Sequence, residues 1–330
     1  MLRDEVLALL KGRGGEPLSG QAVSQELGVS RAAVWKAVEA LRQEGYVISS
    51  APNRGYALEQ SPDRVSAGEL AGALAGRLLG RNLVCLESVD STNNEAKRRA
   101  MGRESDGLAV VALEQTGGRG RRGRSFLSPP GKGIYLSVLL RPRCSLEQVS
   151  ALTAWTAVAV CDALEKLCGF RPGIKWPNDV IWEGRKLCGI LTELELEAES
   201  GRLSHVIVGV GVNISQTAED FGPELAPVAA SLLQALGRIP RRAEVAAAVL
   251  AALDDMYAAF PGAWEEWLER YRAGCLTVGR PVRVLRPGGE AEGFAQGIDE
   301  DFSLLVRWPD GRTEAVSSGE VSVRGLLGYV

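Results

Sequence analysis

The sequence predicts a mixed α+β protein of three domains, and three observations lead to this prediction. The first sixty or so residues carry apolar side chains at helical spacing. The middle of the chain alternates apolar strands with helices, and the last fifty or so residues hold only short strands between turns. We expect domains over residues 1–62, 63–275 and 276–330, with Pro62 and Asp63 at the first boundary.

The composition excludes several classes of protein. Hydrophobic residues make up 45% of the 330 residues, and the net charge of −3 is too small for a polycation that coats nucleic acid or membrane. No apolar run reaches the roughly 18 residues of a membrane span, and Asp4 and Glu5 stand where a signal peptide needs basic residues. The cysteines form no C-x-x-C pair, which favours reduced thiols in a cytoplasmic protein. We expect the single histidine, His205, to be structural, and we expect no metal site.

Residues 1–60 are predicted to form three helices and a hairpin. Ser19 and Ser30 can cap the second and third helices, and the third is expected over residues 31–43. Two short strands, at 46–48 and 56–58, flank a turn at 52–55. The short turn at residues 28–30 has the spacing of a helix-turn-helix.

This segment resembles a winged helix-turn-helix DNA-binding domain, with residues 30–36 in its recognition helix. Residues 1–60 hold seven basic and seven acidic side chains, so charge alone does not separate DNA binding from a small domain for protein contacts. The resemblance favours DNA binding. The outward side chains would be Ser30, Arg31, Trp35, Lys36, Arg42 and Arg54.

The middle domain is predicted to carry strands at 84–86, 108–113, 134–140, 180–182, 188–196 and 206–212. Helices are expected over 146–167, 224–236 and 242–272. In the last domain, strands at 281–284, 293–298, 304–308 and 314–316 are separated by turns at 287–289 and 309–311. That spacing is typical of a small β-barrel.

The most informative segment is a glycine- and arginine-rich loop at residues 117–124. Its dense positive charge repels itself and its glycines lose entropy on ordering, so we expect a loop that is mobile until an anion neutralises it. Arginine binds phosphate and carboxylate bidentately.

Three other interpretations of this loop are weaker. Gly118-x-Gly120-x-x-Gly123 matches a dinucleotide fingerprint, but Pro129 and Pro130 follow where that motif needs a helix. A P-loop would need Gly-Lys-Ser/Thr, which is absent. An RNA-binding arginine tail is disfavoured because the loop lies between two strong strands.

Three further segments place polar groups or bare backbone near strand ends. Residues 175–179 read Lys-Trp-Pro-Asn-Asp, and Pro177 predicts a bend that holds Lys175 near Asp179, either as a surface salt bridge or as an anion and proton site. Thr92 and Glu95 fit a helix capping box, which could also bind a small polar ligand. Residues 209–213 read Gly-Val-Gly-Val-Asn, and these alternate glycines suit tight sheet packing or a flat ligand.

Together these motifs, with Arg-Lys-Leu-x-Gly-Ile at 185–190, resemble the biotin–protein ligase family. The match covers essentially the whole chain and, with the winged helix, is to the bifunctional type that is also the biotin operon repressor. The resemblance implies a class II synthetase-like ligase domain in the middle and an SH3-like barrel at the end. It also implies a two-step reaction: biotin and ATP, with Mg²⁺, give biotinyl-5′-AMP, and a lysine of a carrier protein then takes the biotin.

The resemblance also assigns roles to residues. Ser91, Thr92, Asn93 and Gln115 would hold the ureido head of biotin. Arg119, Gly120 and Arg121 would contact the biotin carboxylate and the phosphate. Lys186, Arg121 and Asp179 are the expected catalytic residues: Lys186 polarises the acyl phosphate, and Asp179 is a base or hydrogen-bond acceptor for the incoming lysine.

Asn178, Gly209, Gly211 and Asn213 would line the adenylate pocket. Phe126 would be the aromatic lid, at a position where the family often has tryptophan. Phenylalanine is smaller and lacks the indole N–H, so this departure concerns adenylate affinity and not the reaction.

The implied partners are operator DNA, a second copy of the chain in a ligand-promoted homodimer, and the biotin carboxyl carrier protein of acetyl-CoA carboxylase or a related carboxylase. Three alternatives stay open at this point. They are a lipoate-type ligase, a ligand-sensing repressor with an inactive catalytic domain, and a ligase whose N-terminal domain no longer binds DNA.

Overall fold

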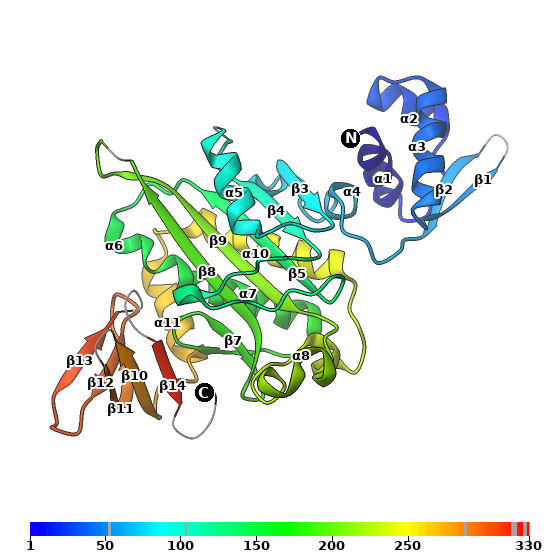
Figure 1. Cartoon of the computed structure of the whole chain (residues 1–330). Helices are drawn as coiled ribbons and strands as arrows, with labels where there is room; N and C mark the ends of the chain where they lie inside the picture. The colour runs from blue at the N-terminus through cyan, green and yellow to red at the C-terminus, as the bar shows by residue number, and fades with distance from the viewer. Residues whose placement is uncertain are drawn as a thin grey trace.

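The computed structural model describes residues 1–51, 54–102, 104–197, 199–286, 289–317, 322–325 and 329. A small helical domain, a large central sheet with its helices and a small C-terminal sheet follow one another across the molecule (Figure 1). This confirms the predicted mixed α+β class. Within the described residues, no helix is both long and apolar enough to cross a membrane.

The N-terminal domain has the predicted order of elements: α1 (Leu2–Gly12), α2 (Gly20–Leu27), α3 (Arg31–Gln43), β1 (Val47–Ala51) and β2 (Gly55–Gln60). Ser19 and Ser30 are the predicted N-caps, and each hydroxyl accepts a hydrogen bond from a first-turn backbone N–H. Gly28 ends α2 with φ of 65°, in the left-handed region that glycine adopts readily. Pro52 and Asn53 of the predicted turn lie outside the described residues.

The central domain is built on a seven-stranded sheet in the order β3-β4-β5-β9-β8-β7-β6. All neighbouring strands are antiparallel except β3 and β4. The strands are β3 (Asn82–Leu86), β4 (Leu108–Ala112), β5 (Gly133–Leu140), β6 (Gly173–Lys175), β7 (Asp179–Trp182), β8 (Arg185–Leu196) and β9 (Leu203–Asn213).

Alternation along β9 decides which face of the sheet becomes the core. Val206, Val208, Val210 and Val212 belong to the main core with α7 (Leu152–Cys168) and α10 (Arg242–Ala259). The other face is covered in part by α5 (Thr92–Met101), which packs on Ile207 (Figure 1). The glycines of β9 are on this second face, where they leave bare backbone beside α5.

The remaining elements of the central domain correct several sequence-based predictions. They are α4 (Ala67–Leu70), η1 (Leu78–Gly80), η2 (Arg121–Gly123), α6 (Leu146–Val149), α8 (Ala218–Leu225), α9 (Leu232–Leu236) and α11 (Trp264–Gly274). The predicted helix 146–167 is two helices, α6 and α7, and the short strand β6 was not predicted. The predicted helix 242–272 is also divided into two helices, α10 and α11, because Pro261 has no N–H to continue α10.

The predicted helix 224–236 is wrong over its first half. Within the expected span, residues 224–225 are the end of α8 and residues 232–236 form α9, whereas residues 226–231 are not helical. The intervening chain pairs with β8 instead: Lys186 donates its N–H to Val228 O at 2.7 Å and accepts from Ala230 N at 2.8 Å. These main-chain bonds compete with helix formation in that segment.

The C-terminal domain is an antiparallel sheet in the order β13-β12-β11-β10-β14. Its strands are β10 (Pro281–Arg286), β11 (Gly289–Ile298), β12 (Leu304–Arg307), β13 (Thr313–Val316) and β14 (Ser322–Gly325). The all-β character is confirmed; β14 was not predicted, and Pro287 and Gly288 of the predicted turn lie outside the described residues.

A buried glutamate joins the N-terminal domain to the central one. Glu69 of α4 has a side chain with no solvent exposure, and it forms ion pairs with Lys11 of α1 at 2.5 Å and with Arg241 at 3.2 Å. Next to it, Gly68 lies so close to Asp4 of α1 that a Cβ would be 2.6 Å from the Asp4 carbonyl oxygen. The two domains therefore meet in a packed and charge-compensated junction.

Candidate active site

A small cavity opens on the face of the sheet that carries α5. Its walls come mainly from the start of α5, the arginine loop and the adjacent strands β8 and β9, with single residues from β5, from the segment after β4 and from the β6–β7 turn. The lining residues are Ser91, Thr92, Asn93, Gln115, Arg119, Gly120, Arg121, Phe126, Tyr135, Asn178, Lys186, Gly189, Ile190, Leu191, Gly209, Val210 and Gly211.

Almost every residue that the sequence assigned to ligand binding lies in this lining, and Asn213 is the exception. Asn213 is buried at the end of β9, and its amide donates to the Lys186 and Ala230 carbonyl oxygens. Because these bonds occupy the amide, Asn213 holds the 228–230 segment against β8 and does not form the cavity wall. The role expected for Asn213 in the adenylate pocket stays a prediction.

Gln115, and not a capping box, accepts a hydrogen bond from the backbone at the start of α5. Ser91 is the N-cap, but its hydroxyl makes no capping bond, and Glu95 pairs with Arg98 and Arg99 instead. Gln115 Oε1 accepts from the Thr92 backbone N–H at 2.9 Å and lies 3.1 Å from Thr92 Oγ1. The predicted Thr92–Glu95 capping box is therefore wrong, because the side-chain amide of a neighbouring strand end takes its place.

Asn93 is fixed by groups on three strands. Its amide donates to Glu193 Oε2 at 2.7 Å and to Leu191 O at 3.3 Å, and its Oδ1 lies 2.6 Å from Ser137 Oγ. It faces Gly209, where a Cβ would overlap Asn93 Oδ1. Because these contacts fix the Asn93 side chain, its remaining hydrogen-bonding capacity is directed one way only. A site that recognises the polar head of a ligand needs such a fixed group.

The arginine loop forms a tight hairpin over the cavity. Gly120 N donates to Arg124 O at 2.7 Å, and Phe126 N donates to Gly118 O at 2.9 Å. Arg121 lies inside the cavity, 3.4 Å from Asn178 Oδ1, and its burial lowers the pKa of the guanidinium, which stays charged. The predicted mobility of the empty loop stays a prediction.

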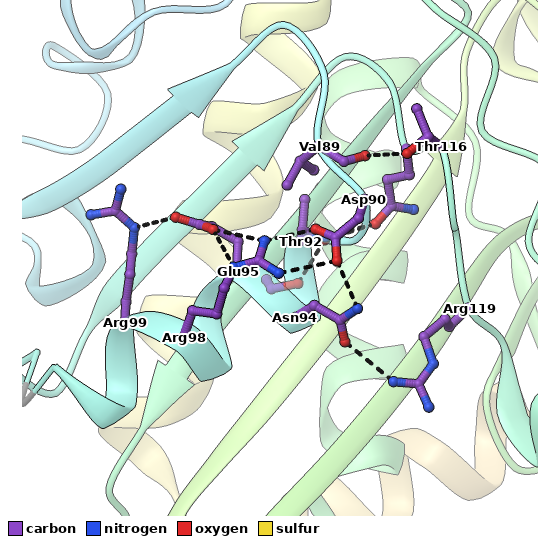
Figure 2. A network of polar contacts seen from close by, with 11 residues as sticks. Val89, Asp90, Thr92, Asn94, Glu95, Arg98, Arg99, Thr116 and Arg119 are labelled. Atoms are coloured by element: carbon purple, nitrogen blue, oxygen red, sulfur yellow. Dashed lines mark hydrogen bonds and ion pairs between the residues drawn. The ribbon is translucent and has the colours of Figure 1, made fainter.

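Arg119 is more exposed and is held by a network at the start of α5 (Figure 2). It donates to Asn94 Oδ1 at 3.2 Å, and Asn94 in turn donates to Asp90 Oδ2 at 2.9 Å. Arg98 pairs with Asp90 at 2.7 Å, which holds the pKa of this carboxyl far below its usual range. The network therefore fixes the orientation of the Asn94 side chain, which accepts the hydrogen bond from Arg119.

Phe126 lies against bare backbone on the neighbouring strands. A Cβ at Gly211 would be 2.7 Å from the Phe126 ring, and one at Gly189 would be 3.0 Å from it. Lys186 Nζ lies 5.5 Å from the ring centroid. These glycines give the aromatic ring room to lie flat beside the lysine.

Lys186 and Asp179 form a partly buried ion pair at the site. Their Nζ and Oδ1 atoms are 2.6 Å apart, and their side chains are 24% and 13% exposed. Burial on its own would raise the pKa of Asp179, but the Lys186 ammonium and a hydrogen bond from Tyr329 hold it below its ordinary value. Asp179 is therefore ionised: its carboxylate accepts hydrogen bonds, but it is a weak base.

Several residues of the site were not predicted. Tyr135 of β5 and Leu191 of β8 line the cavity, and their pairing with Gly211 and Gly209 places them on the same face of the sheet as those glycines, which strand alternation could have indicated. Glu193 and Ser137, which fix Asn93, carry no signal in sequence because their partners are remote in the chain. Within the described residues, no group of three or more His, Cys, Asp or Glu side chains could hold a metal ion.

The surface predicted to bind DNA is exposed on α3 and the hairpin. Ser30, Arg31, Lys36 and Arg54 are exposed, and Trp35 shows 54% of its surface. Arg42 is different, because its guanidinium donates to Ile48 O at 2.6 Å and pairs with Glu39. The outward orientation expected for Arg42 is therefore wrong: it ties α3 to the hairpin.

Comparison with known proteins gives matches to each part of the chain. Family models match residues 3–57 (HTH domain), 85–213 (Biotin/lipoate A/B protein ligase family) and 277–324 (Biotin protein ligase C terminal domain). The bifunctional ligase/repressor BirA of Bacillus subtilis (strain 168) is 36% identical over 318 residues, which cover 94% of this chain and 95% of that protein. The chain belongs to the bifunctional biotin–protein ligase/repressor family.

Two further matches agree with this membership. The bifunctional ligase/repressor BirA of Escherichia coli (strain K12) is 30% identical over 335 residues, covering 97% of this chain and 96% of that protein. A biotin protein ligase from Aquifex aeolicus, solved in complex with biotin and ATP, is 32% identical with a TM-score of 0.63 and covers 74% of this chain and 99% of its own. Membership of the biotin ligase family makes the open alternative of a lipoate-type ligase the weaker one.

Proposed function

We propose that this chain is an ATP-dependent ligase that joins biotin to a lysine of a biotin carboxyl carrier protein, and that it also represses transcription of biotin genes. The observation that carries the ligase proposal is the cavity lining. It combines three cations, Arg119, Arg121 and Lys186, with the neutral polar groups of Asn93 and Gln115 in one cavity. This combination suits a small molecule with a polar head, an apolar body and an anionic end.

In the first step, a biotin carboxylate oxygen attacks the α-phosphorus of ATP. The new O–P bond gives biotinyl-5′-AMP, and the bond to the β,γ-phosphates breaks to release pyrophosphate. Both reactants are anions, so their repulsion must be offset as they approach. Arg121, which lies inside the cavity, and Lys186 are placed to do this.

Mg²⁺ enters this proposal as part of the ATP substrate. Magnesium is usually bound through substrate phosphates and one or two carboxylates. Among the described residues the cavity lining contains no carboxylate, and the nearby Asp179 is paired with Lys186. The phosphates of ATP, together with water, would therefore supply most of the metal's ligands.

In the second step, the carrier lysine attacks the acyl carbon of the adenylate as a neutral amine. The C–N bond forms, AMP leaves, and the amine loses a proton. Lys186 can hold the charge on the departing phosphate, and Asp179 keeps the Lys186 ammonium in place. Because the pKa of Asp179 is lowered, we propose a positioning role for it and not the role of base.

The arginine hairpin and Phe126 would shield the mixed anhydride from water between the two steps. Phe126 closes one side of the cavity, and the hairpin carries Arg121 over it. We propose that the hairpin loosens when the site is empty and orders around the adenylate.

The repressor role is supported by the exposed face of α3. Trp35, Arg31 and Lys36 present an aromatic and two cationic groups on a helix with the position of a recognition helix. We propose that biotinyl-5′-AMP promotes a homodimer whose paired helices bind a two-fold operator. The six cysteines form no disulfide, and we place the protein in the cytoplasm on that basis.

One assay tests the ligase proposal directly. The protein is incubated with ATP, Mg²⁺ and a carrier domain, together with biotin or with lipoate, and the mass of the carrier is followed. A mass gain with biotin is expected. A gain with lipoate alone would refute the proposed substrate, and no gain with either would refute the activity.

A footprinting experiment tests the repressor proposal. A biotin operator fragment is probed with the protein alone and with biotin plus ATP added. Protection that depends on the ligands is expected, whereas equal protection without them would refute the co-repressor role. Absence of protection in both would support the alternative of a ligase that has lost DNA binding.

A further inference from the structure

Tyr329, near the end of the chain, reaches the ion pair at the centre of the site. Its hydroxyl donates to Asp179 Oδ2 at 2.7 Å. The other carboxylate oxygen, Oδ1, faces Lys186 Nζ at 2.6 Å. The two oxygens of Asp179 are thus divided between Tyr329 and Lys186.

The Tyr329 ring has a second contact beside the first. Lys175 Nζ lies 3.5 Å from the centroid of the ring, and Lys175 is 6% exposed. Lys175 and Asp179 are direct partners in the β6–β7 hairpin, so one tyrosine contacts a cation and an anion that face each other across a turn. A desolvated ammonium over an aromatic face is a favourable contact.

Other contacts hold the same turn against the C-terminal half of the chain. The Trp176 indole N–H donates to Phe302 O at 3.0 Å, and the Trp176 backbone N–H donates to Thr277 Oγ1 at 2.9 Å. The C-terminal domain therefore packs directly on residues 175–179, and Tyr329 extends this contact to the catalytic ion pair.

We infer that Tyr329 is a positioning residue for the proposed reaction: by holding Asp179 Oδ2 it directs Oδ1 to Lys186 and so fixes the lysine toward the acyl phosphate. This inference rests on the proposed function and adds a C-terminal residue to the machinery of that site. Neither Tyr329 nor Asp179 lies in the cavity lining, so the tyrosine acts from behind the lysine and does not plug the cavity.

The charge around Asp179 gives this role a pH signature. The hydrogen bond from Tyr329 favours the ionised carboxylate, and removing it raises the pKa of Asp179. Without this hydrogen bond, activity that needs ionised Asp179 should be lost at a higher pH than in wild type when the solution is acidified. The other charged and titratable groups that face Asp179 are Lys186, Lys175, Arg121, Tyr271 and Cys188.

The test compares Tyr329→Phe with wild type in the full-length protein. Biotin-dependent pyrophosphate release is measured across pH, with kcat and KM determined separately. A hydrogen bond to a charged group is lost, so we expect kcat to fall roughly tenfold, with KM for biotin and ATP unchanged within about twofold. The acidic limb of the kcat profile should move to higher pH.

Tyr257→Phe is the matched control. The Tyr257 hydroxyl also contacts a carboxylate, Asp106 Oδ2 at 3.0 Å, but this pair lies outside the cavity. We expect the control to leave kcat and its pH profile unchanged even if it lowers the melting temperature. Tyr329→Leu, which also removes the ring from Lys175, should lose at least as much kcat as Tyr329→Phe.

The outcomes separate the inference from the proposed function. A Tyr329→Phe enzyme with the kcat and pH profile of wild type would overturn the inference while leaving the function standing. A rise in KM with unchanged kcat would also overturn it, because the residue would then act in binding. Wild-type protein that releases no pyrophosphate with biotin would overturn the proposed function, and the inference with it.

Discussion

Gly209 on β9 faces Asn93 on α5 so closely that a methyl group at residue 209 would overlap the Asn93 Oδ1 atom. This contact joins a feature seen in sequence, the glycine on a strand, to one that only the fold provides, the start of α5. The bare backbone of Gly209 is the space that the Asn93 side chain needs to lie in the cavity wall.

Gly209→Ala is therefore expected to weaken biotin binding. The added methyl group must displace Asn93, which is held by Glu193 and Ser137 and cannot move without breaking those bonds. We expect the Kd for biotin, measured by calorimetry, to rise at least about tenfold, corresponding to one lost polar contact. Gly72→Ala, where the added group meets nothing within 4 Å, is the control and should bind as wild type does.

Arg121 and Arg124 provide a second matched pair, in one loop. Arg121 lines the cavity, whereas Arg124 is exposed and outside the lining. Arg121→Ala should lower carrier biotinylation by roughly a hundredfold or more, because it removes a charge that offsets the repulsion between two anions. Arg124→Ala should change the rate by no more than about twofold. Equal effects of the two substitutions would show that the loop acts through its overall charge.

The Lys186–Asp179 pair should contribute to stability as well as to activity. Lys186→Met leaves the partly buried Asp179 carboxylate without its closest cation, and urea unfolding should show a loss of roughly 1–3 kcal/mol in unfolding free energy. Adding Asp179→Asn to that variant removes the uncompensated charge and should recover part of the loss. Additive losses in the double variant would contradict direct coupling of the two side chains.

The same pair gives a pH dependence whose sign follows from the lowered pKa. Asp179 binds its proton less readily folded than unfolded, so its contribution to stability is present above the unfolded value of about 4 and is lost as pH falls through the folded pKa. Asp179→Asn should therefore flatten the acidic side of the unfolding free energy curve. A curve parallel to that of wild type below pH 4 would contradict this.

Much of the site was predictable because its chemistry lies in short segments. The arginine loop carries its charges within a few residues, so its composition indicated an anion site, whereas the Lys175–Asp179 bend on its own left a surface salt bridge open. The partners of the Asn213 amide, the Ala230 and Lys186 carbonyls, could not be predicted, because contacts between segments remote in the chain leave no pattern in the sequence. Helix ends were misjudged where tertiary pairing overrides local preference, as it does in the segment that pairs with Lys186.

The buried Glu69 at the domain junction makes a prediction about how the domains are held together. Glu69→Gln removes the charge that offsets both Lys11 and Arg241, and leaves those cations near a buried amide. We expect a loss of about 3 kcal/mol in unfolding free energy and faster proteolysis of the segment between the domains. Glu59→Gln, on an exposed residue of β2, should do neither.

The exposed face of α3 makes a prediction about salt. If Lys36 contacts a phosphate of operator DNA, Lys36→Ala should weaken binding to every sequence to a similar extent and reduce the slope of log K against log salt by about 1. Arg13→Ala, which removes an exposed charge at the end of α1, should leave the slope unchanged. Trp35→Ala tests a different contribution, because an exposed aromatic ring makes apolar contacts that salt does not screen. Its effect should appear as weaker binding with the wild-type slope, and a change of slope in Trp35→Ala would show that the variant has moved the helix and its charges.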